Sequence, residues 1–351
     1  MAKVRSDLIA QGKEPCSPGT GGYIQARYRL SKDLILRALR ETGQQLHTQT
    51  EEIWLWKGRR VVLVDGSTVT MPDTPENQEK YPQPASQEAG IGFPIARIAV
   101  LISFATGGVL DFALGPHKGK KTGEHALFRQ MFGSLCAGDV LIADRYYCSY
   151  FLIVALKKAG LDAVFQIHAS RKSDFRRGLR LGTKDHIVRW NKPVRPDWMD
   201  QETYDSMPDT VAVRETKVGG KILISTFMDP KEVGRQDLAQ LYKIRWTVEI
   251  DLKFIKQVLH MDVLRCKTPE MVFKEIGVHL LAYNLIRTVI AQAASIHRRL
   301  PNTISFKGAV QALNAFRGNI LFVTDDKLSK LLDELPYPRL MQPRSAARLF
   351  L

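Results

Sequence analysis

Two short apolar runs, each ending at an aspartate, constrain the fold of this chain more than any other feature. VVLVD ends at Asp65 and VLIAD ends at Asp144. Runs that are apolar at every position are typical of strands buried on both faces of a sheet. Ligand sites in such sheets lie beyond the carboxyl ends of the strands. If the two strands are parallel neighbours, their aspartates lie close together at one edge of the sheet.

The patterns around these runs predict a mixed sheet that is covered by helices. Apolar and β-branched stretches between turn residues predict strands, and apolar positions at helical spacing predict helices. Ser31 is the expected N-cap of the first helix, and Gly160 is expected to close a later one. The predicted elements are strands at 59–71, 139–147 and 162–168, a hairpin at 96–115, and helices at 31–46, 122–135, 149–160, 235–260 and 269–299. This order is typical of an α/β fold.

Two segments depart from this order of strands and helices. Residues 1–30 are rich in Gly, Pro and Ser and predict an irregular lead-in. Residues 169–234 contain several prolines, short β-like pieces and a dense run of Lys and Arg from Arg171 to Arg195. This run predicts an insertion whose face meets an anion, with a solvated loop as the alternative. The helix at 269–299 is apolar on most sides and is expected to be a buried scaffold helix.

The charge and the cysteine content limit the classes of function that this chain can have. Lys and Arg outnumber Asp and Glu by 51 to 36, which gives a formal charge of +15 and favours polyanionic partners, nucleic acid above all. The four cysteines form no CxxC pair, which disfavours a zinc ribbon or a disulfide scaffold and fits a reducing cytoplasm. No signal-peptide pattern is present, and the longest apolar runs are shorter than the ~20 residues of a membrane span. We therefore expect a cytoplasmic protein that acts away from membranes.

The stretch LYKIRWTVEIDLKFIKQ (241–257) predicts a helix with an unusual polar face. Advancing about 100° per residue places four side chains on one stripe beside the apolar face. The stripe consists of Tyr242, Arg245, Glu249 and Lys256. Trp246 lies next to it. An i,i+4 pair such as Glu249 with Lys253 on a solvated face is the alternative.

These residue types fit phosphodiester chemistry. Asp65, Asp144 and Glu249 supply oxygen ligands without His or Cys, a set that suits two Mg²⁺ or Mn²⁺ ions about 3.5–4 Å apart. Arg245 and Lys256 are suited to bind phosphates, and we expect Tyr242 to contact the DNA phosphates beside them. Because Asp-Gly after a strand is a common turn, Asp65 also has a purely structural interpretation.

Further cationic and aromatic residues are candidates for contact with DNA. GPHKGKKTGEHALF (115–128) fails the Walker pattern but places several lysines ahead of a helix N-terminus, where anions bind readily. A solvated loop is an equal alternative there. Trp246 is suited to stack on an unpaired base. The remaining candidates are Lys118, Lys120 and Lys121 in this loop and Arg176 and Arg177 in the basic run.

Together these residues resemble a known family. Y-x₂-R-x₃-E-x₆-K, formed by Tyr242, Arg245, Glu249 and Lys256, resembles the YREK signature of bacterial insertion-sequence DDE transposases. VDGSTVTMPDT and GDVLIADRYYCSYF are similar to the segments that carry the first and second aspartates of that family, and MDVLRCKTPEMVFKEIGVHLLAYNLIR is similar to the run after the signature. The similarity spans residues 60–295.

The resemblance implies an RNase H-like core, a mixed sheet flanked by helices, with a β-rich insertion before the helix of the catalytic glutamate. The implied organisation is a lead-in and shortened DNA-binding region at 1–58, a first core part at 59–168, the β-rich basic insertion at 169–234, a second core part at 235–300, and a C-terminal helical tail at 301–351. Relatives usually carry a longer N-terminal helical region, so this copy is a candidate for a truncated element.

The resemblance also implies an activity. Such enzymes cut DNA at transposon ends and join it to a target, as dimers on paired ends, with Asp65, Asp144 and Glu249 as the metal-binding triad. Similar members pass through a DNA hairpin and flip a base onto tryptophan, a role that Trp246 resembles by position and that Trp190 or Trp198 could share. Two alternatives stay open: a catalytically inactive DNA-binding remnant, and a metal-dependent nuclease that cuts without joining.

Overall fold

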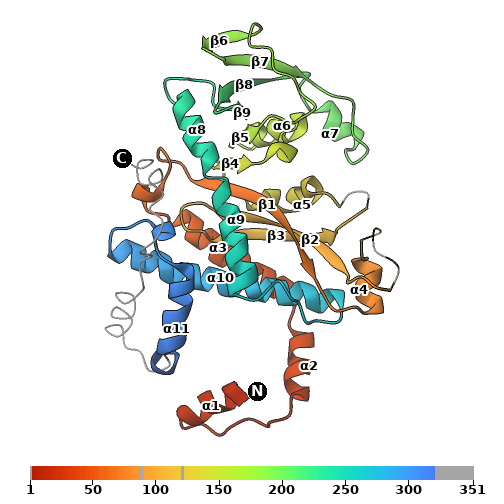
Figure 1. Cartoon of the computed structure of the whole chain (residues 1–351), viewed down its shortest axis with the longest axis vertical. Helices are drawn as coiled ribbons and strands as arrows, with labels where there is room; N and C mark the ends of the chain where they lie inside the picture. Colours follow the sequence, from red (N-terminus) through yellow and green to blue (C-terminus); the bar gives the residue numbers. More distant parts are fainter. Residues whose placement is uncertain (1, 85, 87, 89, 120–121, 321–351) are drawn as a thin grey trace.

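The computed structural model describes residues 2–84, 86, 88, 90–119 and 122–320. Its framework is one nine-stranded sheet with the order β3-β2-β1-β4-β5-β9-β8-β7-β6 (Figure 1). β1–β4 and β4–β5 pair in parallel and the other neighbours are antiparallel. The strands are β1 Val61–Thr70, β2 Ile95–Ser103, β3 Val109–Pro116, β4 Val140–Ala143, β5 Asp162–Gln166, β6 Leu179–Gly182, β7 Asp185–Asn191, β8 Thr210–Val218 and β9 Lys221–Ser225. The predicted mixed sheet is confirmed.

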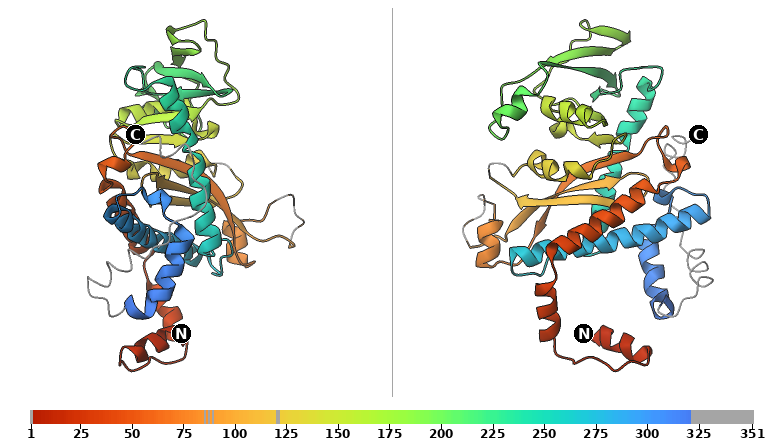
Figure 2. Two further views of the ribbon diagram at one scale, coloured as in Figure 1. Left: turned by 60° about the vertical axis from the view of Figure 1, so that its left-hand side comes forward. Right: turned by 180° about the vertical axis from the view of Figure 1, so that it is seen from behind.

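Helices cover both faces of the sheet. α3 and α10 lie side by side under one face with α9, and α5 and α6 cover the other (Figures 1 and 2). The helices are α1 Ala2–Ala10, α2 Gly21–Arg29, α3 Lys32–Thr48, α4 Pro75–Lys80, α5 Glu124–Met131, α6 Tyr150–Lys158, α7 Gln201–Asp205, α8 Arg235–Lys243, α9 Trp246–Lys253, α10 Pro269–Ile296 and α11 Phe306–Ile320. Of the predicted C-terminal tail, 321–351 lies outside the described residues.

Strand β1 shows why its apolar run predicted burial on two sides. Val61 and Leu63 pack into the core below the sheet, with α3, α9 and α10. Val62 and Val64 pack into the core on the opposite face, with α5 and α6. The predicted turn at Asp65 is wrong, because β1 continues to Thr70 through antiparallel pairing with β2. Asp65 therefore lies within a long strand rather than at its end.

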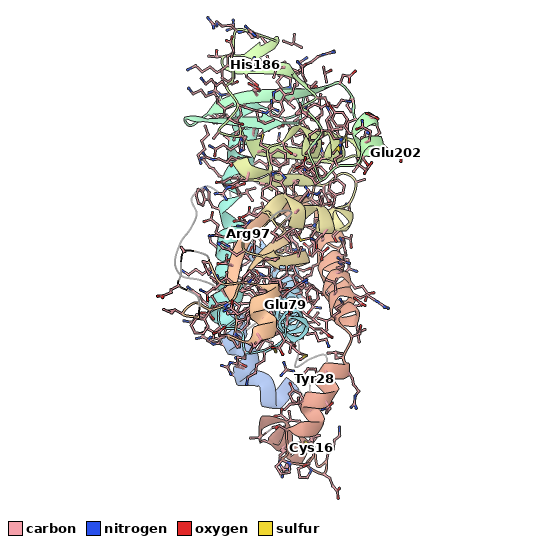
Figure 3. All side chains as sticks on the ribbon, turned by 90° about the vertical axis from the view of Figure 1, so that its right-hand side faces the viewer. Cys16, Tyr28, Glu79, Arg97, His186 and Glu202 are labelled. Atoms are coloured by element: carbon pink, nitrogen blue, oxygen red, sulfur yellow. The ribbon has the colours of Figure 1, made fainter. Side chains whose placement is uncertain are left out.

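Residues 1–30, the predicted irregular lead-in, contain two helices. α1 and α2 are helical, and they extend away from the sheet with few contacts to the core (Figure 2). No residue of α2 is buried. Figure 3 places Cys16 and Tyr28 at the opposite end of the molecule from His186 of the insertion. The Ser31 cap is confirmed, since its Oγ accepts a hydrogen bond from the backbone N–H of Asp33 at 3.1 Å.

The insertion is β-rich, as expected, but it continues the core sheet. β9 pairs with β5, so β6 to β9 extend the same sheet instead of forming a separate unit. An ion pair stabilises its interior: the fully buried Arg214 donates two hydrogen bonds to Asp185, at 2.8 and 2.6 Å. Thr216 Oγ1 donates a third at 2.7 Å. Paired in this way, the buried charges are compatible with an ordered fold.

Helix α10 is the predicted scaffold helix. Within the described part of the chain it alone is long and apolar enough, by length and composition, to cross a membrane. Its side chains Ile276, Leu280 and Tyr283 are buried in the core below the sheet. Asn284 exchanges two hydrogen bonds with the backbone of Val109 on β3, each of 2.7 Å. These contacts are those of a core helix in a globular protein.

Candidate active site

The parallel pairing of β1 with β4 brings the two predicted aspartates together. Leu63 pairs with Ile142, and continuing that register by two residues on both strands sets Asp65 level with Asp144. β4 ends one residue earlier, and Asp144 then accepts a hydrogen bond from the N–H of Tyr146 at 2.8 Å as the cap of a 3₁₀ turn. Asp65 accepts one from the N–H of Gly66 at 2.8 Å. The expectation of parallel neighbouring strands is confirmed.

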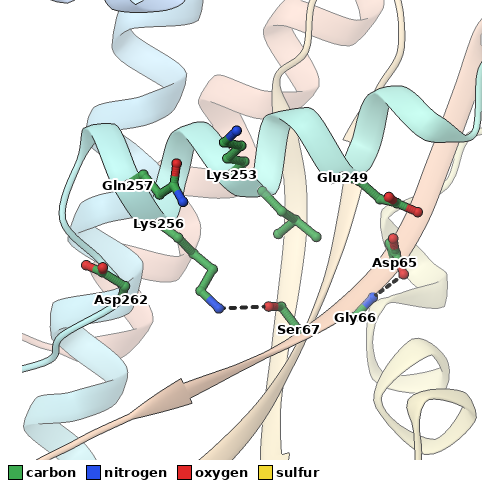
Figure 4. Close-up of a pocket in the computed structure, with 9 residues that line it drawn as sticks. Asp65, Gly66, Ser67, Glu249, Lys253, Lys256, Gln257 and Asp262 are labelled. Carbon is green, nitrogen blue, oxygen red and sulfur yellow. Dashed lines mark hydrogen bonds between the residues drawn. The ribbon is translucent and has the colours of Figure 1, made fainter.

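Glu249 faces Asp65 across a pocket of ≈ 470 Å³ (Figure 4). The two carboxylates point toward one another from α9 and from β1. Lysines line the rest of the pocket on the side of α9. Residues on its wall include Asp65, Ser67, Glu249, Lys253 and Lys256. The structure thus places the third predicted acid beside the first.

A buried ion pair on the far side of α9 holds Glu249 in this orientation. Asp251, two residues later, points into the core. There it accepts a hydrogen bond from the hydroxyl of Tyr283 at 2.9 Å and pairs with Arg287 of α10. Because residues two apart lie on different sides of a helix, anchoring Asp251 to α10 turns Glu249 toward the sheet.

Lys256 is fixed to strand β1. It lies in a π-helical turn, Phe254–Val258, that follows α9. Its Nζ donates to Ser67 Oγ at 3.2 Å (Figure 4). It also donates to the Thr68 carbonyl at 2.9 Å. Ser67 and Thr68 of β1 therefore accept both hydrogen bonds of this lysine. Single π turns inside helices are frequent at functional sites.

The helical-wheel prediction is wrong in one part. The chain does not form one helix over 235–260, because α8 ends at Lys243 and a turn at Ile244–Arg245 precedes α9. A uniform count of 100° per residue therefore fails across the break. Tyr242 lies in the core, only 5% exposed, instead of on the polar stripe.

Arg245 and Trp246 begin α9 beside the acids. Arg245 pairs with Glu249 at 3.2 Å, an i,i+4 contact in place of the alternative pair with Lys253. The Arg245 guanidinium carbon lies 4.3 Å from the ring centroid of Trp246, a cation–π distance. Trp246 is 51% exposed, so part of its indole remains accessible to a ligand.

Burial and like charges disfavour ionisation of Asp65. They raise its pKa from 3.8 to about 6; burial is the largest cause, and Glu124 and Glu249 add to it, while the Gly66 N–H and Arg245 oppose it. An acid crowded in this way is stabilised by a cation. The donors are all carboxylate oxygens, the ligand type of Mg²⁺ and Mn²⁺. In the described ranges, however, no three His, Cys, Asp or Glu side chains converge closely enough to hold one ion.

Sequence reasoning missed Glu124 and Tyr147. Glu124 is the first residue of α5, and its pKa is raised by burial and then by Asp144. Tyr147 is buried beside the same acids, which raise its pKa further after burial. A carboxylate in the first turn of a helix is commonplace, so no local signal connects Glu124 with Asp65.

The other predicted DNA contacts differ in their placement. Lys118 is exposed in the loop before α5, whereas Lys120 and Lys121 lie outside the described residues. Arg176 and Arg177 are exposed on the insertion and pair with Asp174.

Trp190 does not have the accessibility expected of a stacking residue. It is 6% exposed, and its Nε1 donates to Glu215 at 3.0 Å. Arg171 covers its ring at 3.9 Å. Trp190 is thus placed as a core residue of the insertion. Trp198, the alternative, is 40% exposed and stacks with Arg129 at 4.0 Å.

A mixed α/β sheet that carries acids beside basic side chains is typical of the class of enzymes that act on nucleic acid. Residues 56–285 match the family model described as a transposase DDE domain, and the chain belongs to this family. Its mixed sheet is flanked by helices, as the resemblance implies. The protein is a DNA transposase, an enzyme that acts on DNA.

The chain is also similar to individual proteins. The chain is 26% identical over 309 residues to the transposase InsG of insertion sequence element IS4 from Escherichia coli K12, covering 86% of this chain and 68% of that one. It is 34% identical over 80 residues to the transposase of insertion sequence element IS421 from Escherichia coli, covering 23% of this chain and 22% of that one. A cryo-EM structure of the piggyBac transposase synaptic complex with hairpin DNA is similar at a TM-score of 0.44 and 9% identity. The match covers 82% of this chain and 60% of that one.

Proposed function

We propose that Asp65, Asp144 and Glu249 are the acids of a two-metal phosphoryl transfer on DNA. The register that sets Asp65 level with Asp144 supports this proposal most strongly. The pocket shared by Asp65 and Glu249 adds the third carboxylate. Two divalent ions, when bound to such acids, activate the attacking oxygen and stabilise the leaving one.

The neighbouring cations then bind the DNA backbone. Arg245 is a planar donor suited to bind a phosphate in a bidentate fork, and Lys256 offers a point charge. Arg245 pairs with Glu249, and Lys256 bonds to Ser67 and Thr68. We propose that DNA phosphates replace these partners, which frees the Glu249 carboxylate to approach Asp65. An unpaired base stacks on the exposed face of Trp246.

The proposed substrate is DNA at the ends of an insertion sequence, which is cut and then joined to a target. A basic chain of net charge +15 favours such a polyanion. We propose that the protein acts in the bacterial cytoplasm, on the nucleoid, as a dimer that holds two ends together.

The test is strand cleavage of end-containing DNA in the presence of Mg²⁺. Asp144→Ala and Glu249→Ala should each abolish cleavage and leave DNA binding largely intact, because the acids hold cations rather than phosphates. Asp197→Ala, which changes an exposed aspartate on the insertion, is the matched control and should cleave like the wild type. Full cleavage by Glu249→Ala would contradict the proposal.

The same assay separates the two alternatives. A binding-only remnant would show neither cleavage nor stabilisation by Mn²⁺ in the wild type. A nuclease would cleave but yield no product in which the 3′ end is joined to target DNA. A trapped strand-transfer product is the result expected here.

A further inference from the structure

The Glu124 carboxylate lies against Gly66, next to Asp65, where a side chain at residue 66 would displace it. A Cβ at Gly66 would lie 2.9 Å from Glu124 Oε1 and 3.0 Å from its Cδ. The backbone of Gly66 is ordinary strand, so contact with Glu124, rather than a left-handed conformation, is what favours glycine here. α5 thus delivers an acid to β1 from the face of the sheet opposite α9.

The Glu124 carboxylate is linked electrostatically to both aspartates. It interacts with Asp144 and contributes to the unfavourable charge around Asp65. Arg97 of β2 opposes this charge. Arg245 also opposes the charge at Asp65, but it is paired with Glu249, so a further positive charge would stabilise the arrangement.

Tyr147 is an independent sign of a missing polar partner. Its side chain is fully buried, and its hydroxyl has no hydrogen-bond partner among the residues that the structure describes. It interacts electrostatically with Glu124, Asp65 and Asp144. Phe128 packs on its ring with centroids 5.7 Å apart, which fixes the hydroxyl in place. A buried, unpaired hydroxyl is unfavourable by about 1–3 kcal/mol, so it marks a position where a polar group is expected to bind.

We infer that Glu124 is a fourth carboxylate of the cation site, with the buried Tyr147 hydroxyl as the group that positions it. The inference rests on the proposed function and adds a ligand that lies outside the three acids of the DDE set. The ligand class is a divalent cation with bound water, since every donor is a hard oxygen. Glu249 approaches β1 from the face that α9 covers and Glu124 from the opposite face, so cation binding draws the carboxylates together.

The experiment measures Mn²⁺ binding to the full chain by the loss of the free-ion EPR signal. Glu124→Gln keeps the size of the side chain and removes its charge, and it should weaken Mn²⁺ binding about 10-fold or more. Glu202→Gln changes an exposed carboxylate on α7, away from Arg97 and the site (Figure 3), and should bind Mn²⁺ like the wild type.

A pair of glycine variants tests the position of Glu124 without altering any carboxylate. Gly66→Ala introduces a methyl group that displaces the end of the Glu124 side chain, and it should weaken Mn²⁺ binding in the same direction as Glu124→Gln. Gly133→Ala is the matched control, since a Cβ there meets no atom within 4 Å. Tyr147→Phe removes the positioning hydroxyl and should produce a smaller loss of affinity.

Thermal melting in EDTA separates a cation ligand from a structural residue. In metal-free protein, burial and Asp144 outweigh the attraction of Arg97, so the Glu124 charge is unfavourable on balance and Glu124→Gln should melt at the wild-type temperature or above it. A lower melting temperature together with unchanged Mn²⁺ affinity would overturn the inference and identify Glu124 as a partner of Arg97. If the wild type itself binds no Mn²⁺, the proposed metal chemistry fails and the inference fails with it.

Discussion

Replacing Asp65 with asparagine should make the metal-free protein more stable at neutral pH. Folding moves this carboxyl from water into a partly buried position near Glu124 and Glu249, which raises its pKa from 3.8 to about 6. The folded protein therefore binds this proton more tightly than the unfolded chain does. The ionised form is disfavoured on folding, and asparagine removes that penalty while keeping an oxygen that can accept the Gly66 N–H.

The magnitude follows from the pKa difference. Raising the pKa from 3.8 to about 6 corresponds to about 3 kcal/mol above pH 6, at about 1.4 kcal/mol per pKa unit. Because Asp65 is partly exposed, we expect a measured gain of about 2 kcal/mol. The pH dependence follows from linkage between folding and protonation. The loss of stability caused by ionised Asp65 is absent below the pKa of the unfolded chain, grows as pH rises from 3.8 and is complete above about 6.

The assay is urea unfolding followed by circular dichroism, in EDTA, at pH 7.5 and 4.5. Asp65→Asn should unfold at higher urea than the wild type at pH 7.5, and the difference should shrink at pH 4.5. Asp197→Asn, at an exposed aspartate, should match the wild type at both values. The reasoning is refuted if Asp65→Asn is no more stable at pH 7.5, or if its advantage does not depend on pH.

Three further substitutions test other parts of the structure. Arg287→Met leaves Asp251 buried without its cation and should lower the free energy of unfolding by about 3–5 kcal/mol, seen as a lower melting temperature; an unchanged melt would show that the pair does not anchor α9. Trp246→Ala should weaken binding to DNA with an unpaired terminal base by about 1–3 kcal/mol in fluorescence anisotropy, with no loss of stability. Trp190→Ala should lower the stability and leave DNA binding unchanged, because it removes a buried donor to Glu215. Normal stability with weakened DNA binding would instead show that Trp190 reaches DNA.

The parts of the fold that sequence could predict are those determined by local pattern. The apolar run before Asp144 and the capped helix after Ser31 carry their own signals, since burial on two faces and capping leave a periodic or positional trace. The sequence predicted that Asp65 and Asp144 lie close together if their strands are parallel neighbours, and β1 and β4 do pair in parallel. The turn expected at Asp65 was not found, because pairing with β2 overrides the local Asp-Gly preference.

The missed features depend on contacts between distant segments. The helix is interrupted before α9 and forms a π turn after it. Asp251 of α9 pairs with Arg287, and Lys256 of the π turn bonds to β1. Nothing in residues 241–257 specifies these two contacts. Glu124 reaches Asp65 through the missing side chain of Gly66, a relation across the sheet that periodicity does not record. Buried partners likewise account for Trp190, whose sequence context is that of a basic surface strand.

The location of bound metal tests the central claim most directly. Crystals of the full chain soaked in Mn²⁺ should show an anomalous scattering peak shared by carboxylate oxygens of Asp65 and Asp144, at roughly 2.1 Å as for Mg²⁺. Glu249 should lie at the same or an adjacent ion. Anomalous peaks confined to other surfaces at saturating Mn²⁺, with these acids unligated, would contradict the assignment of this site to metal-dependent DNA transfer.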